Sequence, residues 1–167
     1  MTIVLKQKVR RLDNDLETII GLYLSRLDRG SGVLLESAEV DGRWGRHSLA
    51  AGDFLLAARC VEGRLALEIK DPRLEPLMAY AGLDYLDGLR QLMKSLRLEP
   101  DPDFPRLPAM TRALYGFLGY GAATLMEKKL HRLLPPAAAE AAFILPARLY
   151  FFDHAYNQLV EVSLLED

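Results

Sequence analysis

The stretch ARLYFFDHAYNQLVEVSL, residues 147–164, contains two strand-like segments on either side of a short turn. ARLYFFDH and QLVEVSL are rich in the aromatic, aliphatic and β-branched residues that strands favour, and Ala155, Tyr156 and Asn157 lie between them. Two strands joined by so short a turn run antiparallel. The stretch therefore predicts an antiparallel hairpin near the C-terminus.

Upstream of this hairpin, strands and helices are intermixed. Strands are predicted at residues 33–38, 54–60 and 65–69, and helices at residues 14–27, 84–96 and 120–134, with one or two helical turns at residues 137–142. A Glu62-Gly63 turn joins two of the strands, and the proline-rich EPDPDFPRLP, residues 99–108, predicts a loop. The elements do not alternate as βαβ units, which favours an α+β fold. We expect a single domain over residues 1–167, a mostly antiparallel sheet and about three packed helices.

Composition and charge exclude several classes of protein. The chain has 167 residues, a net charge of −2 and one cysteine, Cys60, so neither a basic nucleic-acid surface nor an internal disulfide is expected. No apolar run approaches the ~18 residues that a membrane-spanning helix needs. The start, MTIVLKQKVRR, places its apolar residues before its basic ones, the reverse of a secretory signal. These features predict a cytoplasmic protein with no nucleic-acid or membrane partner.

The usual catalytic and metal-binding motifs are missing. His47, His131 and His154 fit no zinc pattern, and no serine stands in a nucleophile elbow. The glycines of GFLGYG, residues 116–121, match neither a P-loop nor a dinucleotide fingerprint, so close packing of a strand is the preferred interpretation. We expect no catalytic residue, no metal site and no cofactor in this chain.

The segment GVLLESAEVDGRWGRHS, residues 32–48, carries an acid, Glu36, directly after three aliphatic residues. Apolar residues on both faces of this segment indicate a central strand covered on both sides. A buried lone carboxylate costs several kcal/mol unless it is compensated. Three solutions remain open: the strand ends at Glu36, the acid pairs with Arg43 or Arg46, or it lines a polar pocket. A pocket with Glu36 for an ammonium, the Ser37 hydroxyl as donor and His47 for a carboxylate would suit a large α-amino acid.

Four motifs in order resemble the N-terminal region of anthranilate synthase component I and of its relative aminodeoxychorismate synthase component I. They are LLES at residues 34–37, RWGRHS at residues 43–48, GFLGY at residues 116–120 and FDH at residues 152–154. The resemblance covers roughly residues 24–164. It implies that the LLES strand belongs to a feedback site for L-tryptophan, with Leu35 as apolar wall and Glu36 and Ser37 as contacts. His47 stands where some members have a basic residue of the site. The chain departs from the family after the glycines, where GYG replaces GYD.

The resemblance also implies what lies outside this chain. In the family a chorismate-binding domain follows and carries the catalytic residues and the Mg²⁺ ligands, so residues 1–167 would be the regulatory domain alone. Implied partners are that domain, a glutamine amidotransferase subunit and L-tryptophan as effector. The whole protein would be a lyase that converts chorismate and glutamine or ammonia to anthranilate and pyruvate. We expect the isolated chain to be inactive and to bind L-tryptophan weakly or not at all.

Two alternatives remain open at this point. The chain would also suit the equivalent domain of aminodeoxychorismate synthase component I, in the folate pathway, or a free-standing interaction module. The local motifs do not separate these possibilities, and a small independent enzyme is the least favoured of all.

Overall fold

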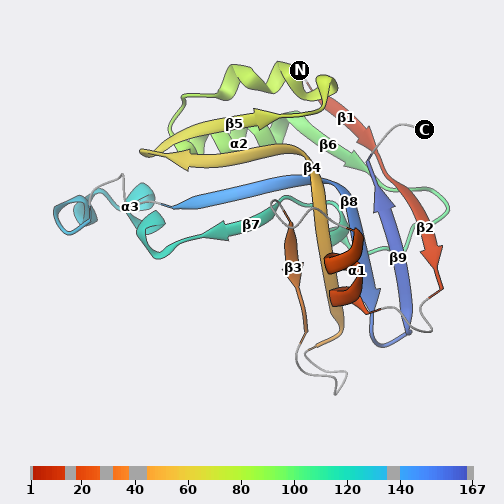
Figure 1. Cartoon of the computed structure of the whole chain (residues 1–167). Helices are drawn as coiled ribbons and strands as arrows, with labels where there is room; N and C mark the ends of the chain where they lie inside the picture. The colour runs from red at the N-terminus through yellow and green to blue at the C-terminus, as the bar shows by residue number, and fades with distance from the viewer. Residues whose placement is uncertain (1, 14–17, 27–31, 38–44, 135–139, 165–167) are drawn as a thin grey trace. The chain divides into compact units, whose positions relative to one another are not determined.

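The computed structural model describes residues 2–13, 18–26, 32–37, 45–134 and 140–164. It confirms an α+β fold with a mostly antiparallel sheet (Figure 1). The strands are β1 (Ile3–Lys6), β2 (Lys8–Leu12), β3 (Val33–Leu35), β4 (His47–Val61), β5 (Arg64–Ile69), β6 (Leu96–Glu99), β7 (Tyr115–Leu118), β8 (Ala141–Asp153) and β9 (Gln158–Ser163). The α-helices are α1 (Ile19–Arg26), α2 (Tyr85–Ser95) and α3 (Ala123–Met126), and short 3₁₀ helices are η1 (Pro72–Tyr80), η2 (Ala109–Thr111), η3 (Tyr120–Ala122) and η4 (Lys128–Arg132).

Contacts divide the chain into two compact units. The first unit comprises residues 1–4, 55–97 and 114–145, and the second comprises residues 5–54, 98–113 and 146–167. Strands β4 and β8 are long enough to contribute residues to both units.

In the first unit, the predicted hairpin is confirmed. The end of β4 pairs antiparallel with β5, in a register that sets Leu56 opposite Ile69 and Val61 opposite Arg64. Glu62 and Gly63 form the turn with positive φ values of 51° and 79°, a conformation that suits glycine. Helix α2 lies against this hairpin, and a Cβ on its Gly88 would stand 2.7 Å from the Leu65 side chain.

Strand β7 of the same unit pairs antiparallel with the start of β8. Gly116 stands opposite Phe143, and a Cβ added to Gly116 would lie 1.8 Å from the carbonyl oxygen of Ala142. No side chain fits so close to a neighbouring backbone. The close-packing interpretation of this glycine is therefore confirmed.

In the second unit, β2, β9 and the end of β8 form an antiparallel sheet, and β3 pairs antiparallel with the start of β4. The predicted C-terminal hairpin is confirmed, with Phe151 opposite Val160 in β8 and β9. Helix α1 covers one face of these strands. Its Ile19 and Leu22 form a core cluster with Ala50, Tyr150 and Leu159. We call the side of these strands that α1 covers the helix face. The opposite side, where a cavity opens beside Phe151 and Val160, is the cavity face.

Three predictions of local structure are corrected. Strand β3 is not a doubly covered central strand, since it pairs in the described residues with β4 alone and Leu35 is 50% exposed. The predicted helix over residues 120–134 is broken at Glu127, whose backbone is extended and whose side chain accepts from the Lys129 N–H. Ala141 and Ala142 belong to β8 rather than to a helical turn. Residues 14–17, which would begin the first predicted helix, lie outside the described residues; the described helix begins after Thr18, whose hydroxyl accepts from the Gly21 N–H.

Candidate functional site

The candidate site lies in the second unit, where β3 ends beside the start of β4. Side chains alternate between the two faces of a strand. Leu34 packs against the α1 core cluster on the helix face, so alternation directs Leu35 to the cavity face. His47 belongs to the cavity face as well, because its ring lies 5.0 Å from the ring of the buried Phe151.

Ser37 is held at the end of β3 by two hydrogen bonds to β4. Its backbone N–H donates to Ser48 Oγ at 3.0 Å, and its own hydroxyl donates to the His47 carbonyl at 2.7 Å. The buried Ser48 hydroxyl also bonds to His154 Nε2 at 2.8 Å. The single hydroxyl proton of Ser37 is therefore committed to the protein, contrary to the expected donation to a ligand. Its oxygen keeps its capacity to accept.

Glu36 is exposed and follows the last residue of β3. Of the three alternatives predicted for this acid, the structure shows the first: the strand ends before Glu36 and leaves its carboxylate in water. Arg43 lies outside the described residues. Arg46 does not pair with Glu36, because its guanidinium bonds to Asp153 instead.

Asp153, at the end of β8, is the most heavily engaged carboxylate of this region. Arg46 Nη2 donates to it at 2.8 Å, the Ala155 N–H donates at 3.0 Å, and His47 Nε2 lies 3.5 Å away. Burial raises the pKa of Asp153, but the hydrogen bonds and charge of Arg46, with help from Ala155 and His47, lower it by more. The net pKa lies below the ordinary carboxyl value of 3.8, so the folded state favours the charged form.

This lowered pKa predicts a pH-dependent contribution to stability. A carboxyl whose folded pKa is depressed stabilises the fold above its unfolded pKa and loses that contribution as pH falls through the folded pKa. We expect Asp153→Asn to lower the free energy of unfolding by about 1–3 kcal/mol at about pH 7, and by much less at about pH 3. Urea denaturation of both proteins at the two pH values measures the difference. A deficit of equal size at both values would contradict the assignment.

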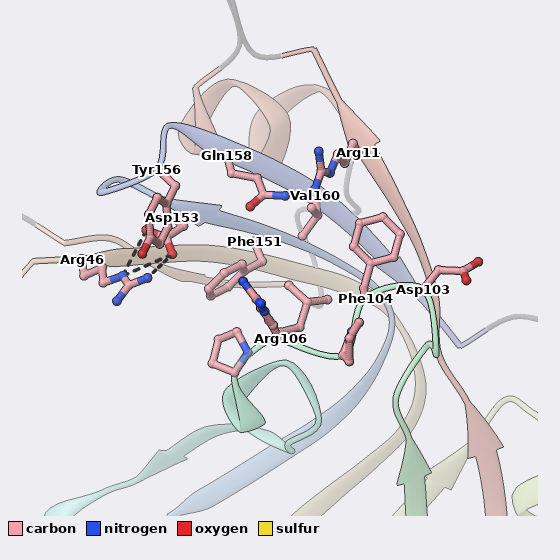
Figure 2. Close-up of a pocket in the computed structure, with 13 residues that line it drawn as sticks. Arg11, Arg46, Asp103, Phe104, Arg106, Phe151, Asp153, Tyr156, Gln158 and Val160 are labelled. Atoms are coloured by element: carbon pink, nitrogen blue, oxygen red, sulfur yellow. Dashed lines mark hydrogen bonds and ion pairs between the residues drawn. The ribbon is translucent and has the colours of Figure 1, made fainter.

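A cavity of about 590 Å³ opens on the cavity face of the second unit, beside Asp153 (Figure 2). Loop residues 103–108 form one wall, and Arg11 of β2 with Phe151 of β8 and Val160 of β9 line the opposite side. None of Leu35, Glu36, Ser37 and His47 lines this cavity. His47 lies next to Phe151 and Asp153, and both of these residues line the cavity.

The described residues contain no group of three or more histidine, cysteine, aspartate or glutamate side chains arranged to hold a metal ion. His131 bonds to the Thr124 carbonyl at 2.9 Å, and His154 to Ser48, so both histidines have structural partners. Among the residues that the structure describes, no helix has the length and apolar character needed to span a bilayer.

Sequence reasoning missed the Arg46–Asp153 ion pair and the cavity beside it. Both residues stand in motifs quoted above, RWGRHS and FDH, but they are 107 positions apart. Only the pairing of distant strands brings them together. The sequence shows the order of these motifs, but their order does not reveal which of their residues lie close together in space.

Comparison with known proteins finds a distant relative. No protein-family model matches the chain. Over 116 residues the chain is 24% identical to anthranilate synthase component 1 of Pseudomonas aeruginosa. The aligned region is 70% of this chain but only 22% of that protein, so the chain spans about a fifth of its relative. This similarity is distant and partial, and it involves the enzyme family that the four motifs resemble.

Proposed function

We propose that this chain is the non-catalytic, effector-sensing region of a chorismate-utilising enzyme related to anthranilate synthase component 1. The effector is L-tryptophan, and it binds at the end of β3. The region reports its occupancy to a chorismate-binding domain and a glutamine amidotransferase subunit. Such coupling requires that the effector interact differently with two states of the whole protein.

The observation that carries the proposal is the arrangement of three consecutive residues at the end of β3. Glu36 is an exposed carboxylate that makes no ion pair or hydrogen bond within the described residues. The Ser37 oxygen is fixed by its bond to the His47 carbonyl and still accepts hydrogen bonds. Leu35, 50% exposed, offers an apolar surface beside them. Strand β3 ends at Leu35, so Glu36 does not continue the alternation of the strand, and an ammonium group on Glu36 and Ser37, with a large side chain on Leu35, uses all three.

The distant relative supports the enzyme family, and the residue chemistry supports a non-catalytic role. Within the described part of the chain, His131 bonds to a backbone carbonyl and His154 to the buried Ser48 hydroxyl, and neither ring is hydrogen-bonded to a carboxylate as the histidine of a catalytic triad is. The chemical step then belongs to the chorismate-binding domain. Purified chain incubated with chorismate and ammonia should form no anthranilate, and measurable turnover by the chain alone would contradict a sensing role.

The binding site itself is tested by calorimetric titration with L-tryptophan. We expect a dissociation constant on the order of 1 mM for this chain. Glu36→Gln keeps the size of the side chain but removes the charge that faces the ammonium, and should weaken binding about tenfold. Glu75→Gln removes another exposed carboxylate, in the first unit, and should change nothing. Equal affinities for Glu36→Gln and the unmodified chain would exclude Glu36 from the site.

A further inference from the structure

The cavity of the second unit has an apolar floor and a stiff opposite wall. Phe151 and Val160, neighbours across β8 and β9, lie at the bottom of the cavity and are buried, at 2% and 1% exposed, so only a small part of each side chain faces it. Phe104 faces them from the loop, which also contains Pro105 and Pro108. Proline fixes φ, so this wall loses little conformational freedom when a ligand enters. The two surfaces suit a flat apolar body.

The charges around this cavity favour an anion. Three arginines and two aspartates line it, which leaves one net positive charge. Arg46 is committed to Asp153, whereas Arg11 and Arg106 make no ion pair with a carboxylate in the described part of the chain. The Arg11 guanidinium lies 5.8 Å from the Phe104 ring centre, and Figure 2 shows the Arg106 side chain extending from the loop toward Phe151.

From these two features we infer that the cavity binds a small aromatic carboxylate. The ring lies against the partly exposed Phe104, above the buried Phe151 and Val160, and the carboxylate accepts hydrogen bonds from the Arg106 and Arg11 guanidiniums. Planar guanidiniums match carboxylate oxygens better than an ammonium does. A volume of about 590 Å³ accommodates such a ligand. The inference does not depend on the proposed effector site, since Glu36 and Ser37 do not line the cavity.

Benzoate is the probe, and amide chemical shifts of the ¹⁵N-labelled chain are the measurement. Benzoate should shift the amides of Phe104, Arg106 and Gln158 saturably, while benzyl alcohol, which has the ring but no charge, should bind at least fivefold more weakly. Arg106→Gln should weaken benzoate binding about fivefold. Arg90→Gln, which removes an exposed arginine of α2 in the first unit, is the matched control and should leave the affinity unchanged.

Three results would overturn the inference. The first is the absence of saturable shifts at these amides, and the second is equal affinity for benzoate and benzyl alcohol on the unmodified chain. The third is an Arg106→Gln variant that binds benzoate as well as Arg90→Gln does. Benzoate lacks an ammonium, and its signals come from the cavity. A negative benzoate result therefore does not count against L-tryptophan binding at Glu36, and a negative L-tryptophan titration does not count against the cavity site.

Discussion

Gly116→Ala is expected to destabilise the chain by about 3 kcal/mol, as severe overpacking does. The added Cβ would lie 1.8 Å from the Ala142 carbonyl oxygen and 2.7 Å from the Phe143 Cα. Both atoms belong to the backbone of β8, so neither can rotate away. Relief requires β7 to separate from β8, which breaks their antiparallel hydrogen bonds. Thermal denaturation should show a midpoint lower by about 6–12 °C.

Gly119→Ala is the matched control for this substitution. Gly119 lies three residues further on, has φ −68° and ψ 165°, and its Cβ would meet the Glu140 carbonyl oxygen at 3.1 Å. Any residue adopts that backbone conformation. We expect a much smaller loss of stability than for Gly116→Ala. Equal midpoints for Gly116→Ala and the unmodified chain would mean that β7 does not approach β8 as described.

Leu22→Ala is expected to cost about 3–4 kcal/mol of unfolding free energy, a typical value for a fully buried leucine. Leu22 is 0% exposed and packs in the cluster with Ala50, Tyr150 and Leu159. Truncation leaves a cavity between α1 and the strands, and the surrounding side chains belong to β4, β8 and β9, which relax little. Urea denaturation followed by circular dichroism measures the loss.

The control is Leu24→Ala, two residues along the same helix. Leu24 is 49% exposed, so its truncation removes less buried surface and creates no enclosed cavity. A loss below about 1 kcal/mol is expected, in line with other surface substitutions. If the two variants lost similar stability, α1 would not present Leu22 to the sheet.

The hairpins were predictable from sequence because their signals are local. Glu62-Gly63 sits between two apolar runs, and Ala155-Tyr156-Asn157 does the same for β8 and β9. The helix predicted over residues 120–134 failed because side chains take up its backbone groups. Thr124 Oγ donates to the Gly121 carbonyl, and His131 occupies the Thr124 carbonyl that a continuous helix would use. Periodicity of apolar residues does not reveal such competition.

The candidate site was predictable only in part. Alternation correctly separated Leu34 from Leu35, since Leu34 packs in the helix-face cluster. Whether β3 was central or at an edge depended on which strands pair with it, a long-range property, and the exposure of Glu36 follows from that position. The cavity was not predictable because its walls come from residues 103–108 and from β2, β8 and β9. Whether Leu35, Glu36, Ser37 and His47 contact L-tryptophan stays a prediction.

The central claim is that L-tryptophan binds at the end of β3. A ¹⁵N–¹H correlation spectrum recorded during titration with L-tryptophan tests it at the level of single residues. The account predicts saturable shifts of the Leu35, Glu36, Ser37 and His47 amides, with Ser37 among the largest because its N–H and hydroxyl both bond to β4. Unchanged signals for these four amides at concentrations well above about 1 mM would contradict it.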